Sequence, residues 1–408
     1  MDSTFTINDF FLYISIPLIS GFVGWFTNFA AIKMMFYPIH FFGIRPFGWQ
    51  GIIPTKSTKI ASKSVDLLTA KLLKIEDQFA LLDPDIVSHE MEESLSRVTR
   101  KTVDLIMQSE IPYLWENSPT SVKISIYESI EEKIPGVTEK ILFDIGRNIR
   151  EMLDLKKLTL DTVLEKPGLL NEIFMKCGEK EFKFIEISGL YFGFLFGLVQ
   201  MVIAYFYNPW WLLPLFGVFV GYATNWLALK LIFEPKEPIY FLGMRFQGLF
   251  LQRQITVAEV YSKIITQEIL TTERIFRYTL QNTGKKKLSE IFNIRISELV
   301  DDTYDDIKDV IQKFVDEDFA KKHLGIVKNI AHFTFMAEFH ICLRDAFPYA
   351  DQVFDLKNNI QKKIEDLPYE DFEGLLRPAF KEDEWILISV GAILGGCAGV
   401  LQFILLFQ

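Results

Sequence analysis

The chain has 408 residues, of which 50% are hydrophobic and 14% aromatic, yet 24% are charged. This mixture argues against a chain made mostly of packed membrane spans, and favours a few spans that carry sizeable charged domains. Acidic residues outnumber basic ones by 53 to 43, so nucleic acid is not an expected partner.

Four apolar stretches are long enough to cross a membrane, near residues 10–32, 186–207, 210–232 and 385–407. Each approaches the roughly 20 residues that a helix needs to cross about 30 Å of hydrocarbon. The first stretch lacks a basic leader and a small-residue cleavage site, so it is expected to be a span rather than a cleaved signal peptide.

One block of sequence occurs twice. Residues 17–38 read PLISGFVGWFTNFAAIKMMFYP, and residues 214–235 read PLFGVFVGYATNWLALKLIFEP. A second pair of similar segments, residues 187–202 and 388–404, places glycine at every fourth position and ends in Gln200 or Gln402. The chain is therefore predicted to be a tandem duplication, in which each half begins with a Thr-Asn span and ends with a glycine-rich span.

This pattern predicts an all-α integral membrane protein with four transmembrane helices from two tandem repeats of the same orientation, each with a helical cytoplasmic domain. Periodic apolar residues such as Val65, Leu68 and Leu72 indicate helices between the spans, and strand-like alternation with tight-turn signals is absent. The expected segments are 1–38 (span one with its Thr-Asn motif), 39–185 (first cytoplasmic domain), 186–207 (span two), 210–235 (span three with its Thr-Asn motif), 236–384 (second cytoplasmic domain) and 385–408 (span four).

Basic residues indicate the orientation. Lys and Arg are absent from residues 1–32, 184–229 and 385–408, so all 43 lie in the two charged blocks. Because positive residues stay on the cytoplasmic side, we expect both large domains inside and both termini outside.

Two short segments after the Thr-Asn spans carry aromatic residues together with glycine, namely residues 39–54 and 239–251. Each is too short to cross the membrane. One interpretation is a loop packed under the spans. The other is an interfacial or re-entrant hairpin, since aromatic residues favour the headgroup level.

The Thr-Asn pairs are the candidate binding residues: Thr27, Asn28, Thr224 and Asn225. Polar residues within a span are expected to face protein or water rather than lipid. They either form hydrogen bonds between helices or line a polar ligand site near the axis that relates the repeats. Because Asn28 and Asn225 are equivalent, we expect them to approach each other across that axis. The expected helix-packing residues are Gly24, Gly221, Gly189, Gly193, Gly197, Gly391, Gly395 and Gly399.

Signals for catalysis are weak. The five histidines form no zinc-protease motif, and His332, His340 and Cys342 are their nearest approach to a metal-ligand cluster. No nucleotide-binding or nucleophile motif is found. We therefore expect no catalytic residue, no metal and no cofactor, and we do not expect an enzyme.

The block from Gly24 to Pro38, the turn Gly51-Ile52-Ile53-Pro54 and the closing segment from Asp383 resemble the bacterial membrane family called domain of unknown function 445. The resemblance extends over both ends of both halves. It implies a multi-pass protein of the bacterial inner membrane, but it implies no reaction.

Three functional classes follow. We favour a membrane-anchored scaffold or interaction protein that binds protein partners through its cytoplasmic domains, with the lipid bilayer as its other partner. The alternative is a transporter or channel for small solutes or lipids, with a polar site at the Thr-Asn motifs; a membrane enzyme is the third. The spans lack the interior carboxylate that a proton or sodium pathway normally needs. The sequence does not indicate an oligomeric state.

Overall fold

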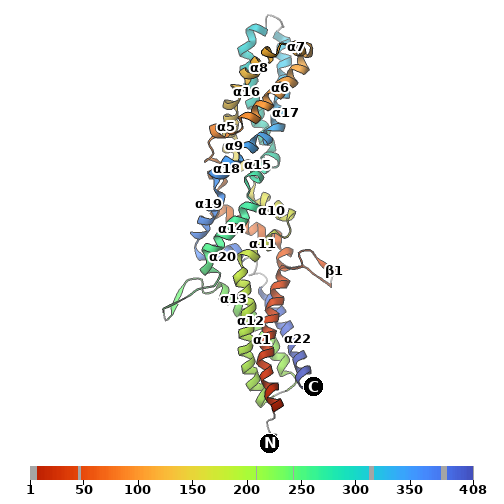
Figure 1. Ribbon diagram of the computed structural model, residues 1–408, viewed down its shortest axis with the longest axis vertical. Coiled ribbons are helices and arrows are strands. Elements are labelled where there is room, and N and C mark those ends of the chain that lie inside the picture. Colours follow the sequence, from red (N-terminus) through yellow and green to blue (C-terminus); the bar gives the residue numbers. More distant parts are fainter. Residues whose placement is uncertain are drawn as a thin grey trace. The chain divides into compact units, whose positions relative to one another are not determined.

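The computed structural model describes residues 7–44, 47–207, 209–241, 243–311, 317–377 and 384–407. Four helices in these ranges are long and apolar enough to cross a membrane: α1 (Ile7–Phe36), α12 (Glu179–Phe206), α13 (Leu212–Phe233) and α22 (Glu384–Phe407). They confirm the predicted all-α class and its four spans. Figure 1 shows them running side by side as one bundle.

The chain divides into two compact units, and both repeats contribute to each of them. The first unit contains Met1–Leu72, Thr159–Ile264 and Asn359–Gln408, and the second contains Leu73–Leu158 and Ile265–Asn358. We expected residues 39–185 and 236–384 to be separate domains. Helices of one repeat instead bury their apolar faces against helices of the other, so that the outer part of each charged stretch shares the second unit.

In the first unit, the spans pack as two pairs. The main contacts join α1 to α12 and α13 to α22, and smaller contacts between α1, α12, α13 and α22 connect the pairs. The other elements of this unit, some of which continue into the second, are α2 (Ile52–Thr55), α3 (Ser57–Leu67), the π-helix η1 (Leu68–Leu72), α10 (Leu155–Glu165), α11 (Leu169–Cys177), η2 (Leu251–Arg253), α14 (Gln254–Glu268), α19 (Leu356–Glu365) and α20 (Tyr369–Leu376).

Glycine residues allow the backbones of the paired spans to contact each other directly. A Cβ atom added to Gly24 would lie 2.2 Å from the carbonyl oxygen of Gly189, and one added to Gly221 would lie 2.0 Å from that of Gly391. The same holds for all eight glycines named above, where an added Cβ would come within 3.0 Å of an atom of the neighbouring span. Small residues permit this kind of helix packing in membranes, where dispersion forces replace the hydrophobic effect.

Two β-hairpins follow the Thr-Asn spans. Strands β1 (Phe42–Ile44) and β2 (Phe47–Trp49) form the first, and β3 (Ile239–Phe241) and β4 (Met244–Phe246) form the second. No strand was expected here, because strands of three residues are too short to show an alternating pattern. Figure 1 shows the two hairpins projecting from opposite sides of the bundle, near the ends of α1 and α13.

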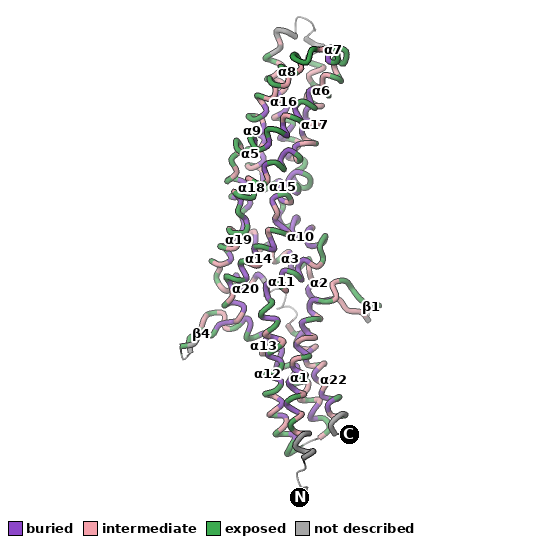
Figure 2. The backbone as a smooth tube through the Cα atoms, viewed as in Figure 1, coloured by how far each residue is buried: buried purple, intermediate pink, exposed green. Residues whose placement is uncertain are grey.

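The second unit is a helical bundle with an aromatic centre. Phe79 and Phe276, which are equivalent positions of the two repeats, have ring centroids 5.3 Å apart, and Phe354 lies against both. Figure 2 shows buried residues along the inner side of these helices. The helices are α4 (Ile75–Phe79), α5 (Pro84–Glu90), α6 (Glu92–Glu110), α7 (Pro112–Asn117), α8 (Thr120–Glu131), α9 (Ile134–Met152), α15 (Thr272–Gln281), α16 (Lys285–Ile311), α17 (Glu317–Cys342), η3 (Leu343–Ala346) and α18 (Phe347–Phe354).

Two neighbouring glycines of α22 provide a test of the backbone contact. A Cβ at Gly395 would lie 2.1 Å from the carbonyl oxygen of Gly217, whereas a Cβ at Gly396 would meet a methyl group of Val218 at 2.8 Å. A side chain can rotate away, but a helix backbone cannot. We expect Gly395→Ala to lower the thermal stability of the detergent-solubilised protein by about 1–3 kcal/mol or more.

The matched variant Gly396→Ala should stay close to the wild-type melting temperature. Equal loss in both variants would show that the glycine-to-carbonyl approach does not hold α13 against α22.

Candidate functional site at the Thr-Asn motifs

The Thr-Asn pairs lie in α1 and α13 and are fully enclosed by helices. Thr27, Asn28 and Thr224 are 0% exposed, and Asn225 is 3% exposed. Small residues three or four positions apart lie on one face of the first span. They allow the second span of the same repeat to come so close that the asparagine side chain reaches its backbone. The site is therefore built from side-chain amides on one span and main-chain carbonyls on the next.

The two asparagines make equivalent hydrogen bonds. Asn28 Nδ2 donates to the carbonyl oxygen of Ile185 at 2.7 Å, and Asn225 Nδ2 donates to that of Leu387 at 3.0 Å. Each bond fastens the first span of a repeat to its second span. The same amide nitrogens also lie where a side chain on Gly189 or Gly391 would be, so the glycines are required for these bonds as well.

The threonines differ between the repeats. Thr27 Oγ1 donates to Gly24 O at 3.1 Å within its own helix. Thr224 Oγ1 lies 2.8 Å from Val220 O and 3.4 Å from Asn28 Oδ1, so its single proton is divided between its own helix and the other repeat. We expected Asn28 and Asn225 to approach each other across the axis. The hydrogen bond that joins the two motifs is instead the long contact between Thr224 Oγ1 and Asn28 Oδ1.

This geometry suits helix packing. Asn28 and Asn225 both donate to carbonyls, and close backbone contacts between the spans surround them. These polar groups are neutral amides and hydroxyls, which offer hydrogen bonds but no ionisable group for proton transfer. The arrangement holds the spans together and leaves little free surface for a solute.

A second polar layer lies further along the α1–α12 pair. Ser20 Oγ donates to Gln200 Oε1 at 2.9 Å, and both residues are buried. In the second repeat, the position equivalent to Ser20 is Gly217, and Gln402 Nε2 is buried without a partner among the described residues. Gln200 therefore bonds to Ser20, one layer away from the Thr-Asn motif.

At the other end of each Thr-Asn span, the chain forms a turn that has equivalent hydrogen bonds in both repeats. The peptide bonds before Pro38 and Pro235 are both cis. Gly51 N donates to Pro38 O, and Gly248 N donates to Pro235 O, each at 2.9 Å. Gln50 closes the first turn on Ile39 O at 2.8 Å, and Gln247 closes the second on Lys236 O at 2.9 Å. Gln50-Gly51 and Gln247-Gly248 are equivalent pairs of the two repeats, and both pairs close the same turn.

A buried ion pair connects the repeats next to these turns. Arg253 Nη1 donates to both carboxylate oxygens of Glu181, at 2.8 and 2.6 Å, and Glu181 is 4% exposed. Burial raises the pKa of the neighbouring Cys177 thiol to about 12, so this cysteine is protonated at neutral pH. Sequence reasoning missed the pair, because its members are 72 residues apart and lie in different repeats.

The duplication gives this pair a counterpart. The residue equivalent to Arg253 is Lys56, and the residue that the span alignment matches with Glu181 is Asp383. A cation after the turn and an acid before the second span are thus present in both repeats. Asp383 lies outside the described residues.

The histidine and cysteine positions noted in the sequence lie on α17. Burial lowers the pKa of His332, and its Nε2 lies 3.3 Å from Ser289 Oγ. Cys342 is buried at the end of the same helix. Within the described ranges, no three His, Cys, Asp or Glu side chains gather as metal ligands.

The Glu181–Arg253 pair generates a stability prediction. Arg253→Met leaves a buried carboxylate without its partner, so we expect a loss of about 3–5 kcal/mol in unfolding free energy. The double variant Glu181→Leu with Arg253→Met should recover most of that loss, because both charges are then removed. Thermal unfolding in detergent measures the change.

The control is Lys176→Met, which removes an exposed ion pair with Glu172 whose atoms lie 2.6 Å apart. Exposed pairs contribute less than about 1 kcal/mol, so this variant should melt near the wild type. An Arg253→Met protein as stable as the control would contradict a structural role for the buried pair.

Comparisons with known proteins give short matches to bacterial membrane proteins. The chain is 38% identical over 64 residues to the UPF0754 membrane protein of Anoxybacillus flavithermus, which is 15% of this chain and 17% of the relative. It is 28% identical over 82 residues to one from Listeria welshimeri (19% of this chain and 22% of the relative). It is 27% identical over 89 residues to one from Staphylococcus epidermidis (21% and 24%).

No family model matches the chain, and no solved structure matches it. The matched segments span about a quarter or less of the curated relatives' own length. Together with the four apolar helices, these similarities support a membrane protein related to an uncharacterised bacterial family.

Proposed function

We propose that this protein is a membrane-anchored scaffold or interaction protein without enzymatic activity, in which the four spans serve as an anchor and the helical domains bind a protein partner. We also propose that it belongs to the domain of unknown function 445 family, in a bacterial inner membrane. The observation that carries the functional proposal is that the asparagine amides of the Thr-Asn motifs are buried and hydrogen-bonded to the neighbouring span of their own repeat.

The second unit offers a surface for such a partner. Helix α8 buries none of its residues. Next to it in the chain, Tyr113 is 78% exposed and Leu114 is 63% exposed, and Ile124 on α8 is also exposed. Helices α7 and α8 both contact α6, so these side chains belong to one region of the unit. Exposed apolar groups gathered in this way are typical of protein-interaction sites.

The alternative is transport through the bundle, with the Thr-Asn motifs as the polar site. Its support is the presence of four polar side chains deep within spans, which are often functional. Against it stands the close backbone contact at Gly24 and Gly221 on the same helices, one turn away from the asparagines.

Two sets of variants separate these functions in a strain that lacks the gene. Asn28→Ala and Asn225→Ala should each cost on the order of 1 kcal/mol of stability and still complement the deletion. Leu114→Asp and Ile124→Asp on the surface of the second unit should fold normally and fail to complement. Melting curves and complementation are measured on the same proteins.

Asn28→Ala with Thr224→Val should also be non-additive, since the two side chains are in contact. Normal folding with lost complementation in the asparagine variants, and retained complementation in the surface variants, would favour the transport alternative.

The proposed topology is tested by labelling with a membrane-impermeant thiol reagent in intact cells. Lys33 and Lys230, at the ends of α1 and α13 next to the charged domains, support a cytoplasmic location for these domains. We therefore expect Ser109→Cys, at an exposed position of α6, to react only after lysis. Trp210→Cys, in the exposed turn between α12 and α13, should react in intact cells. Reaction of Ser109→Cys in intact cells, with reaction of Trp210→Cys only after lysis, would show the opposite topology.

A further inference from the structure

Each hairpin has one face that carries apolar side chains. The register pairs Phe42 with Trp49 in the first hairpin, and side chains two residues apart share a face, which adds Ile44. In the second hairpin, the pairing of Ile239 with Phe246 gives the equivalent face. These positions correspond at the offset of 197, so the apolar face has been retained in both repeats.

The opposite faces are different in kind. In the first hairpin this face holds Gly43 and Gly48, and the ring of Phe41 lies where a side chain of Gly48 would be. In the second it holds Tyr240 and Arg245, and Arg245 Nη2 lies 2.6 Å from Gln247 Oε1 and 3.3 Å from the hydroxyl of Tyr369 on α20. The second hairpin is therefore amphipathic, whereas the first has one apolar face and an opposite face of glycines next to the ring of Phe41.

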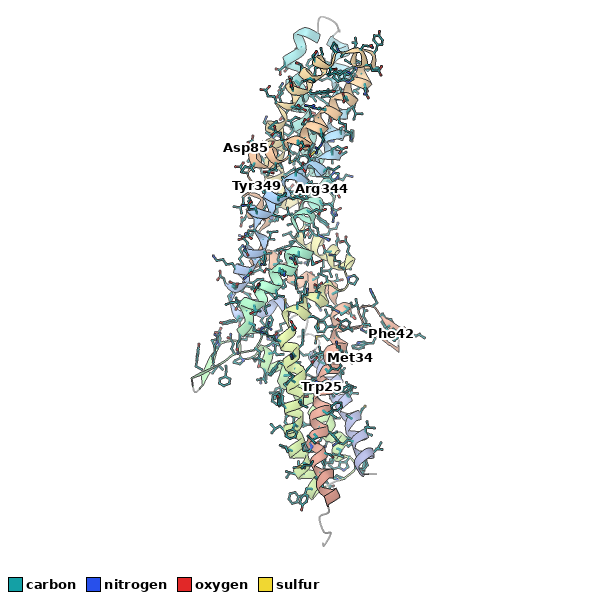
Figure 3. All side chains as sticks on the ribbon, viewed as in Figure 1. Trp25, Met34, Phe42, Asp85, Arg344 and Tyr349 are labelled. Atoms are coloured by element: carbon teal, nitrogen blue, oxygen red, sulfur yellow. The ribbon has the colours of Figure 1, made fainter. Side chains whose placement is uncertain are left out.

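Several apolar side chains on these faces of the hairpins are exposed. Phe42 is 77% exposed, Ile44 is 82% exposed and Ile239 is 56% exposed. Figure 3 shows Phe42 on the hairpin, well to the side of α1, while Met34 stays on the helix beside it. A two-stranded hairpin is marginally stable in water by itself, so an exposed apolar face requires a surrounding that accepts it.

The ends of the Thr-Asn spans indicate the environment in which the hairpins lie. Lys33 Nζ lies over the rings of Phe29 and Tyr37, and Lys230 Nζ lies 5.0 Å from the ring centroid of Trp226. Both lysines are exposed in the last turn of their spans, where cations and aromatic rings mark the headgroup level. Five residues separate the end of α1 from the start of β1, and five separate the end of α13 from the start of β3, so both hairpins start near this level.

We propose that both hairpins lie in the headgroup region of the leaflet at the Lys33 and Lys230 ends of the spans, with their apolar faces turned to the acyl chains. The occupant of the exposed face is thus the lipid surface itself, continuous with the lipid around the bundle. Phe42, Ile44 and Ile239 insert at shallow depth, and the polar face of the second hairpin stays against α20. This goes beyond the proposed scaffold function, because it adds two interfacial anchors to the four spans.

Adjacent residues of β3 provide the test. Ile239 and Tyr240 are neighbours on opposite faces, so a cysteine at each position carries an environment-sensitive fluorophore to one face or the other. Ile44→Cys tests the first hairpin independently, and Tyr113→Cys in the second unit is the water-exposed control. The background variant Cys397→Ala removes the exposed native cysteine, since Cys177 and Cys342 are buried.

The labelled full-length protein is reconstituted into phosphatidylcholine and phosphatidylglycerol vesicles that contain lipids brominated on their acyl chains. We expect quenching at positions 44 and 239 to exceed that at position 240 by at least twofold, with none at position 113. Aqueous iodide should quench in the reverse order.

Iodide quenching at 44 and 239 as strong as at 113 would overturn the proposal, because the faces would then be in water. Protection from both quenchers would overturn it too, since a protein surface would then cover the hairpins. Because Ile44 and Ile239 are in separate hairpins, failure of one variant to fold leaves the other as a test.

Discussion

The approach of glycine backbones to carbonyl oxygens on the neighbouring span is the constraint on which the membrane bundle depends. Gly24 against Gly189 and Gly221 against Gly391 bring two helices within reach of side chains as short as asparagine. Helices in lipid gain nothing from excluding water, so close packing and hydrogen bonds must hold them together. With a larger residue at these glycines, the asparagines would lose their acceptors, and a buried amide without partners is costly.

The duplication explains why so many contacts occur in pairs. The asparagine bonds, the turns closed by Gln50 and Gln247, and the hairpins with one apolar face are each built twice. Elsewhere the copies meet each other, as Phe79 and Phe276 do in the second unit. The copies also differ in places: Gly217 occupies the position of Ser20 in the second repeat, so the hydrogen bond from Ser20 Oγ to Gln200 Oε1 has no counterpart at Gln402.

The spans and packing residues were accessible from sequence because hydrophobic length and repeated spacing are local properties. The Thr-Asn pairs, Gly24 and Gly221 followed from the repeat of residues 17–38 at 214–235, and the other six glycines followed from the second pair of similar segments. Contacts between distant residues were not accessible in this way. Nothing in the chain near Glu181 indicates Arg253, and the partner of Asn28 in the other repeat proved to be Thr224 rather than Asn225. The hairpins were missed as strands because three residues at Phe42 or Ile239 give too short a pattern.

The shared second unit has a consequence for synthesis of the chain on the ribosome. Helices α6 and α9 come from the first repeat, and their main partners α17 and α16 come from the second, with more than a hundred residues and two spans made in between. Contacts this distant in sequence close late and slowly. Until translation passes α17, α6 and α9 lack these partners from the second repeat, and their apolar faces are only partly covered, which is a state prone to aggregation. The second unit can thus be completed only after the second and third spans have been synthesised, so synthesis of the bundle and folding of the second unit are ordered events of one assembly.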